Sequence, residues 1–122
     1  MGVLKSVQLV TEDMVEIVFY DDFHFNLERI KESYKETEAV TKGLKLKRLV
    51  ICGKHTEIDK EARDYGKVMN EQLSAQVVAE ALVVHSFTQK MITNLYLKYI
   101  QKSYPAKSFT DVQKAKDWLA MF

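Results

Sequence analysis

Two apolar runs near the N-terminus, Val7–Val10 and Met14–Tyr20, are separated by a short polar stretch, Thr11–Asp13. Alternate residues of an extended strand lie on the same face. In the second run, one face is entirely apolar, with Val15, Ile17 and Phe19. Adjacent strands with a short polar turn predict an antiparallel hairpin. The next residues, Asp21–Phe25, are expected to form a loop.

A helix is predicted after this loop. Asn26 is a favourable N-cap, and the positions after it recur at spacings of three and four on one helical face: Leu27, Ile30, Tyr34 and Thr37. Lys42 and Gly43 are typical of a helix C-terminus. The first helix is therefore expected to end there.

A buried strand and a second helix come next. Leu44–Cys52 contains an apolar run that is too short for a helix, which predicts a strand covered on both faces. The second helix is predicted to begin near Asp59 and to break near Ser74. Gly66 lies inside this helix and either weakens it or lets a neighbouring element approach.

The segment Ala81–Ser86 predicts another buried strand that leads into a helix cap. Ser86 opens a capping box in which Gln89 bonds back to the N–H of the cap. The amphipathic helix that follows is predicted over Phe87–Lys102, with a broad apolar stripe: Met91, Ile92, Leu95, Tyr96, Tyr99 and Ile100. We expect this stripe to pack on the sheet; the alternative is that it lines a lipid pocket.

Tyr104-Pro105 ends that helix, and Ala106–Phe109 is predicted to be a short edge strand. Thr110 opens a second capping box, and the last helix is predicted to run to the final residue. The apolar face of this helix needs either the sheet or a partner chain. Its end is therefore a candidate surface for a homodimer: Trp118, Met121 and Phe122.

The predicted fold class is α/β, with a single mixed β-sheet of about five strands and about four helices packed on it. The N-terminal hairpin contributes antiparallel strands, and the later strands, separated by helices, are expected to be parallel. At 122 residues the chain is expected to be one domain spanning residues 1–122.

Composition narrows the class of protein. The net charge of +1 indicates neither a nucleic-acid partner nor a membrane surface. A single cysteine, Cys52, excludes an internal disulfide and fits a cytoplasmic protein. No apolar run reaches the roughly 18 residues of a membrane helix, so no integral membrane association is expected.

The C-terminal segments resemble a known family. Ala81–Ser86, Pro105, Phe109-Thr110-Asp111 and Ala115–Leu119 look like the small bacterial proteins of STAS/SEC14 type, also called SpoIIAA-like. The resemblance implies a compact α/β domain. The best-understood relatives antagonise anti-sigma factors by binding a partner protein, and phosphorylation of a serine switches them. In the matching loop, Gly53–Glu57, the Asp-Ser pair is missing and Thr56 is the only hydroxyl.

A ligand crevice is predicted at the carboxyl ends of the parallel strands, where helix N-termini offer free N–H groups. The residues expected there are Asp21, Asp22, His24, Gly53, His55 and His85. Three converging histidines could hold zinc, but their spacing matches no recognised ligand pattern, and we predict no metal and no cofactor. The alternative is three loop histidines that are solvated or that cap backbone groups, and a solvated turn at the two aspartates.

Three other features have two interpretations each. Thr56 and Ser86 are candidate phosphoacceptors or anion contacts, but either is also a plain N-cap. Cys52 ends a buried strand and is expected to be inert. A basic segment is expected to be a solvated strand edge, or else to steer an acidic partner or a phospholipid headgroup: Lys42, Lys45, Lys47, Arg48 and Lys54.

No phosphate-binding loop, dinucleotide fingerprint or catalytic triad order occurs in the sequence. We therefore expect a non-enzymatic regulatory module of STAS-like type that acts through contact with an unidentified protein partner. A SEC14-like domain that binds a small apolar ligand or a lipid is the first alternative. A metal-dependent enzyme with a histidine-lined site is the second.

Overall fold

The computed structural model of the protein describes residues 2–100 and 102–122. Its main sheet has five strands in the order β1-β2-β4-β6-β7. The first pair is antiparallel and every other pair is parallel, so the predicted fold class is confirmed. The strands are β1 (Ser6–Thr11), β2 (Met14–Val18), β4 (Leu46–Ile51), β6 (Val77–Val83) and β7 (Ala106–Phe109).

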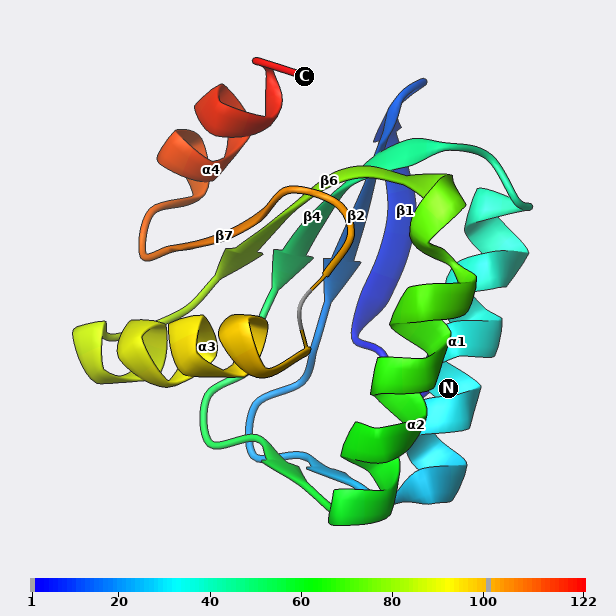
Figure 1. The fold of residues 1–122 in the computed structure, drawn as a ribbon, viewed down its shortest axis with the longest axis vertical. Coiled ribbons are helices and arrows are strands. Elements are labelled where there is room, and N and C mark those ends of the chain that lie inside the picture. The colour runs from blue at the N-terminus through cyan, green and yellow to red at the C-terminus, as the bar shows by residue number, and fades with distance from the viewer. Residues whose placement is uncertain (1, 101) are drawn as a thin grey trace.

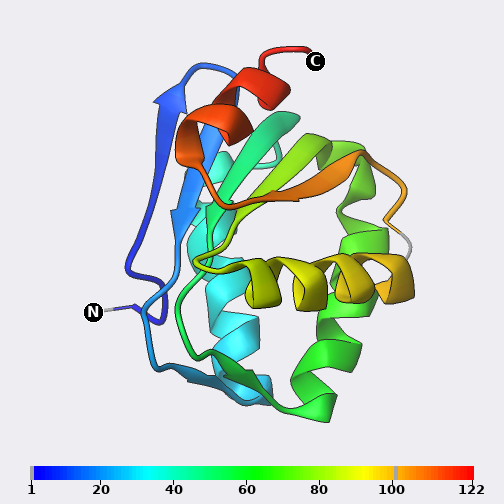
Figure 2. The ribbon, with the colours of Figure 1, turned by 90° about the vertical axis from the view of Figure 1, so that its left-hand side faces the viewer.

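Four α-helices cover this sheet: α1 (Leu27–Thr41), α2 (Lys60–Gln72), α3 (Phe87–Ile100) and α4 (Val112–Leu119). Figure 1 shows α1 and α2 side by side on one flank of the sheet and α4 on the other. Figure 2, turned by 90°, shows α3 running crosswise below β7 and in front of α1 and α2. A single 3₁₀ turn, Ser74–Gln76, stands where the break after the second helix is predicted.

The two faces of the sheet have separate apolar cores. On one face, α4 packs Ala115 and Leu119 against Leu49, Ala81 and Phe109. On the other face, Leu4 packs with residues of β2 and β4: Val15, Ile17, Leu46 and Val50. A third cluster, which contains Phe25, Ile30 and Ala62, ties the first turns of α1 and α2 together.

Two short strands arise where the sequence predicted loops. β3 (His24–Phe25) pairs in parallel with β5 (Glu57–Ile58), so the segments after β2 and β4 are joined beyond the end of the main sheet. In each of these strands the apolar residue lies in the core cluster beside α1 and α2, as Phe25 and Ile58 do. A two-residue strand carries too little periodicity to be recognised in a sequence.

The helix caps agree with the sequence in part. Asn26 caps α1 by accepting a hydrogen bond from the N–H of Arg29, 2.8 Å away, as predicted. The cap of α4 is Asp111 rather than Thr110, since the Asp111 carboxylate accepts from the N–H of Lys114. A carboxylate at a helix N-terminus gains from the helix dipole as well as from the bond.

Three predicted boundaries shift. α4 ends at Leu119 and does not run to Phe122. β6 begins at Val77, earlier than the predicted strand, because the charged Glu80 interrupts its apolar run in the sequence although its side chain is buried. The described part of α3 ends at Ile100; Gln101, inside the helix predicted over 87–102, lies outside the described residues.

Candidate interaction face and sheet-face cavity

The predicted strand-end loops do meet. The Asp21 carboxylate accepts a hydrogen bond from the N–H of Lys54 at 2.8 Å, which lowers the pKa of Asp21. In the other direction, the N–H of Asp22 donates to the carbonyl of Lys54 at 2.7 Å. The first turn of α3 joins them, because the Gln89 side chain donates to the Gly53 carbonyl at 3.0 Å. A shallow, exposed cavity of about 260 Å³ lies beside Asp22, His24, His55 and Glu57.

The three histidines are each held by a different group. His24 Nε2 lies 2.6 Å from Asp59 Oδ1, and His55 Nδ1 lies 3.1 Å from Asp22 Oδ1. His85 Nε2 lies 2.5 Å from the Cys52 carbonyl. Within residues 2–100 and 102–122, no group of three or more His, Cys, Asp or Glu side chains is placed to hold a metal ion.

The candidate hydroxyls and Gly53 have structural contacts. Ser86 Oγ accepts from the N–H of Gln89 at 3.0 Å, so it caps α3. The return bond differs from the predicted capping box, because Gln89 accepts from the N–H of His85. Thr56 is exposed and donates to the Gly53 carbonyl at 3.3 Å. Phosphorylation of either hydroxyl stays a prediction.

At the C-terminus, Trp118 is half-buried between Phe109 and Phe122, with ring centroids 5.7 and 4.9 Å away. Met121 is 77% exposed. Only part of the predicted self-association surface is therefore free for a partner, and the homodimer stays a prediction.

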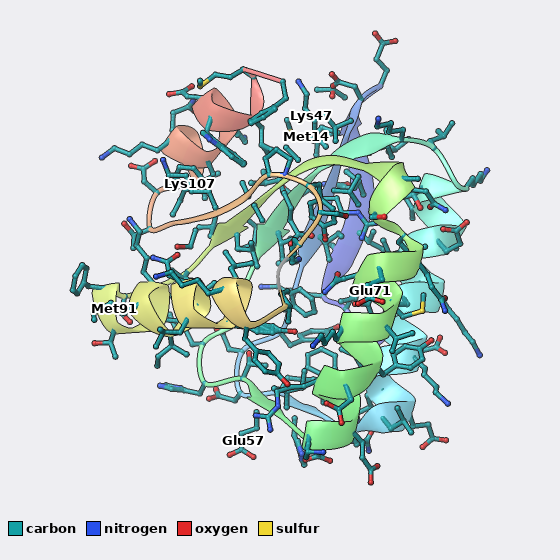
Figure 3. All side chains as sticks on the ribbon, viewed as in Figure 1. Met14, Lys47, Glu57, Glu71, Met91 and Lys107 are labelled. Carbon is teal, nitrogen blue, oxygen red and sulfur yellow. The ribbon has the colours of Figure 1, made fainter. Side chains whose placement is uncertain are left out.

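The helix α3 departs most from the sequence prediction. Five large apolar side chains, each between 55% and 73% exposed, line one side of it: Phe87, Met91, Ile92, Leu95 and Tyr99. We call this set the α3 apolar face. Met91, Ile92, Leu95 and Tyr99 belong to the stripe that was expected to pack on the sheet, so for these four residues that expectation is wrong. Ile100 is buried and Tyr96 lines a cavity on the sheet, as the stripe predicted. Figure 3 labels Met91 near the end of α3 that lies farthest from α1 and α2.

Polar contacts explain the orientation of α3. Its sheet side carries Gln89, which bonds the Gly53 carbonyl, and Asn94, whose side chain lies 2.5 Å from the Ser108 hydroxyl on β7. Ile100 is the buried residue of the helix. These contacts anchor α3 to the strands, with Tyr96 and Ile100 also on its inward side, and leave the α3 apolar face turned outward. Among the described helices, none combines the length and the apolar character that a membrane crossing requires.

A second cavity, of about 200 Å³, lies on the face of the sheet that carries α1 and α2. Its floor includes Arg48 and Val50 of β4 and Glu80 and Leu82 of β6, and Tyr34 of α1 and Tyr96 of α3 contribute to its walls. We call it the sheet-face cavity. Apolar side chains line much of the remainder, including Leu4, Ile17, Phe19 and Ile30.

The basic segment is not a solvated strand edge, because β4 is the middle strand of the sheet. Lys47 and Arg48 are buried, at 9% and 8% exposure. Their side chains point to opposite faces, as the period of a strand requires. Lys47 Nζ lies 3.5 Å from Asp13 Oδ2, near the start of β4, where Figure 3 labels it beside Met14. Arg48 faces the sheet-face cavity.

The charges in the cavity are unevenly paired. Glu80 forms a buried ion pair with Lys102. Burial by itself lowers the pKa of the Lys102 ammonium, but the Glu80 carboxylate opposes this effect and the pKa is raised overall. Arg48 is the register partner of Glu80 on the neighbouring strand, yet it forms no ion pair with any described residue, and its Nε has no hydrogen-bond partner.

The neutral groups of the cavity stay protonated. Burial raises the pKa values of the Tyr34 and Tyr96 hydroxyls, so both remain available as hydrogen-bond donors. Burial also raises the pKa of the Cys52 thiol to about 12. A thiol with that pKa is protonated at neutral pH and is a poor nucleophile, which agrees with an inert cysteine.

The sequence predicts a pocket lined by the stripe of α3 as an alternative, and Tyr96 of that stripe does line this cavity, but the charged residues of its lining were not predicted. The signal for them was a charged residue inside each of two neighbouring buried strands, Arg48 and Glu80, because buried charges require a partner. Charge alone groups Arg48 with the nearby lysines. That grouping ignored the alternation of side chains along a strand.

Comparison with known proteins places the fold and the family. The model of the family called Domain of unknown function (DUF7793) matches residues 8–122. No curated protein matches the chain significantly. The chain is similar to the crystal structure of an uncharacterized protein of the DUF3478 family with a SpoIIAA-like fold from Shewanella loihica PV-4. The TM-score is 0.65 and the sequence identity 14%, over 93% of this chain and 90% of that chain.

At that identity the likeness shows the fold, and it confirms the SpoIIAA-like architecture expected from the sequence. The family model covers nearly the whole length. The chain belongs to the family Domain of unknown function (DUF7793).

Proposed function

We propose that this protein is a non-enzymatic binding module that acts through contact with a protein partner, and that the α3 apolar face is its contact surface. The observation that supports this is the exposure of five large apolar side chains on one helix. Contiguous apolar surface of this kind marks interaction sites in soluble proteins. Phenylalanine, methionine and tyrosine are also enriched in protein interfaces.

The spacing fits a helix that lies in a groove. Phe87, Met91, Leu95 and Tyr99 recur at intervals of four, and Ile92 precedes Leu95 by three. Anchors at such spacings are how amphipathic helices fill an apolar groove of a partner. The face therefore favours a partner with an elongated groove over one with a flat surface.

The charges around the α3 apolar face indicate which residues border the groove of the partner. Residues 87–100 contain Lys90 and Lys98 and no acidic side chain. Lys67 of α2 adds a third cation, with its Nζ 5.0 Å from the centre of the Tyr99 ring. Cations beside an apolar stripe favour a partner whose groove has acidic residues along its edge.

The lipid-binding alternative has less support. The sheet-face cavity holds about 200 Å³, below the roughly 300–1,000 Å³ of pockets for drug-sized ligands, so a long acyl chain does not fit inside it. A histidine-lined enzyme has less support still, because His24, His55 and His85 bond to three different groups.

The test is capture of partners from a lysate of the source organism by the wild type, Leu95→Glu and Val68→Glu. Val68 is 49% exposed on α2 and is the matched control. We expect the wild type and Val68→Glu to retain the same partner and Leu95→Glu to bind it at least about tenfold more weakly, because a carboxylate would be buried in an apolar groove.

Two further measurements separate other occupants of the face. If the wild type sediments with anionic vesicles and Leu95→Glu does not, the face binds a membrane surface and not a protein partner. If the wild type is a dimer in analytical ultracentrifugation and Leu95→Glu is a monomer, the face binds a second copy of this chain. Equal capture by all three variants, each with a native circular dichroism spectrum, would contradict the proposal.

A further inference from the structure

A buried guanidinium without a counter-ion is the starting point. Arg48 is 8% exposed, lines the sheet-face cavity and forms no ion pair with residues 2–100 or 102–122. Its Nε is buried and has no hydrogen-bond partner. Burying an ion without a counter-ion is costly, and buried charges in proteins are accordingly paired. A bound anion would therefore stabilise the Arg48 guanidinium, and the described residues do not provide one.

Glu80 is the nearest candidate along the sheet, since it is the register partner of Arg48. Its carboxylate is already engaged by Lys102, and the two side chains are 8% and 9% exposed. Two cations and one anion thus line the cavity, which leaves one net positive charge there. A ligand with a single negative charge would neutralise it.

The rest of the lining indicates the body of that ligand. Ile17, Phe19, Val50 and Leu82 present apolar surface to the same space as Arg48. Tyr34 and Tyr96 can add hydrogen bonds, because their hydroxyls stay protonated. With about 200 Å³ available, the apolar part must be short, the size of a small ring or a short chain.

We infer that the sheet-face cavity binds a small amphipathic monocarboxylate, with its carboxylate on the Arg48 guanidinium and its apolar part against β2, β4 and β6. The planar fork of arginine matches a carboxylate with two parallel hydrogen bonds. A carboxylate also matches the single net charge better than a doubly charged phosphate does. This site is independent of the α3 apolar face, which lies on the outer side of α3.

Isothermal titration calorimetry with four probes tests the inference: benzoate, hexanoate, hexan-1-ol and inorganic phosphate. We expect the two carboxylates to bind the wild type and to raise its unfolding temperature. We expect hexan-1-ol and phosphate to bind at least about tenfold more weakly, because each lacks one of the two features that the cavity recognises.

Substitutions of Arg48 test whether the carboxylate binds to its guanidinium. Arg48→Met should weaken carboxylate binding at least about tenfold. Without ligand it should unfold at the same or a higher temperature, because an unpaired buried charge is removed. Arg48→Lys keeps the charge but not the fork and should bind with intermediate affinity; it decides the matter if Arg48→Met does not fold. Arg63→Met, at an exposed position of α2, is the control and should bind as the wild type does.

The inference is wrong if neither carboxylate binds the wild type at millimolar concentration. Equal binding by the wild type and the Arg48 variants also overturns it, as does phosphate binding more tightly than both carboxylates. Leu95→Glu should bind carboxylates normally, so the failure of this inference and the failure of the proposed function are distinguishable.

Discussion

Gly53 lies where the loop after β4 approaches the backbone that follows β2. A Cβ atom at this position would stand 2.0 Å from the Tyr20 carbonyl oxygen and 2.8 Å from its carbon. These are backbone atoms that cannot rotate away, so the absence of a side chain lets the loops after β2 and β4 meet. The sequence marks Gly53 as the end of a strand, but it does not show which backbone approaches it.

Gly53→Ala is therefore expected to destabilise the fold by about 1–3 kcal/mol, the usual cost of overpacking. Urea unfolding followed by circular dichroism measures the change in the free energy of unfolding. A variant as stable as the wild type would show that the Tyr20 carbonyl is not held against Gly53 in solution.

At the scale of elements, the helices show how far the sequence pattern reaches. The first helix is placed correctly because its cap and its apolar spacing agree with each other, as Asn26 and Ile30 illustrate. The exposure of α3 could not be predicted, because periodicity shows that a helix has an apolar side but not what that side contacts. Its orientation depends on Gln89 and Asn94, whose partners are far away in sequence.

Gly66 in α2 gives a test at this scale. A Cβ atom there would lie 3.6 Å from the Tyr34 hydroxyl oxygen and 3.9 Å from that of Tyr96, which is ordinary van der Waals contact. Gly66→Ala should therefore raise the free energy of unfolding by up to about 1 kcal/mol, since alanine is the better helix former.

The control is Gly66→Leu. Its longer side chain would collide with the hydroxyls of Tyr34 and Tyr96, so this variant should be less stable than the wild type. Thermal and urea unfolding measure the free energy of unfolding of both variants, as for Gly53→Ala. If Gly66→Ala is less stable than the wild type, the two tyrosines pack more closely on α2 than the structure indicates.

At the scale of the whole molecule, the fold was predictable, and the two proposed binding features were not. The order of strands and helices and the short connections restrict the topology to a mixed sheet, which the structure has. The α3 apolar face depends on how α3 sits relative to the strands, and the sheet-face cavity depends on how α1 and α3 meet β2, β4 and β6. No local pattern encodes these placements. The strand-end loops, where the sequence placed its candidate residues, are held together mainly by hydrogen bonds among themselves.

The two binding features lie on different sides of α3. The outer side presents Met91 and Leu95, while Tyr96 reaches the sheet-face cavity. One helix therefore separates a proposed partner from a proposed ligand. We therefore expect a substitution in one feature to leave the other unchanged.

The most direct test of the central claim is site-specific photocrosslinking in living cells, with a benzophenone amino acid placed at Leu95 or, as a matched control, at Val68. We expect position 95 to cross-link to a partner protein and position 68 not to. Absence of a protein cross-link at position 95, or the same cross-linked product from both positions, would contradict the claim.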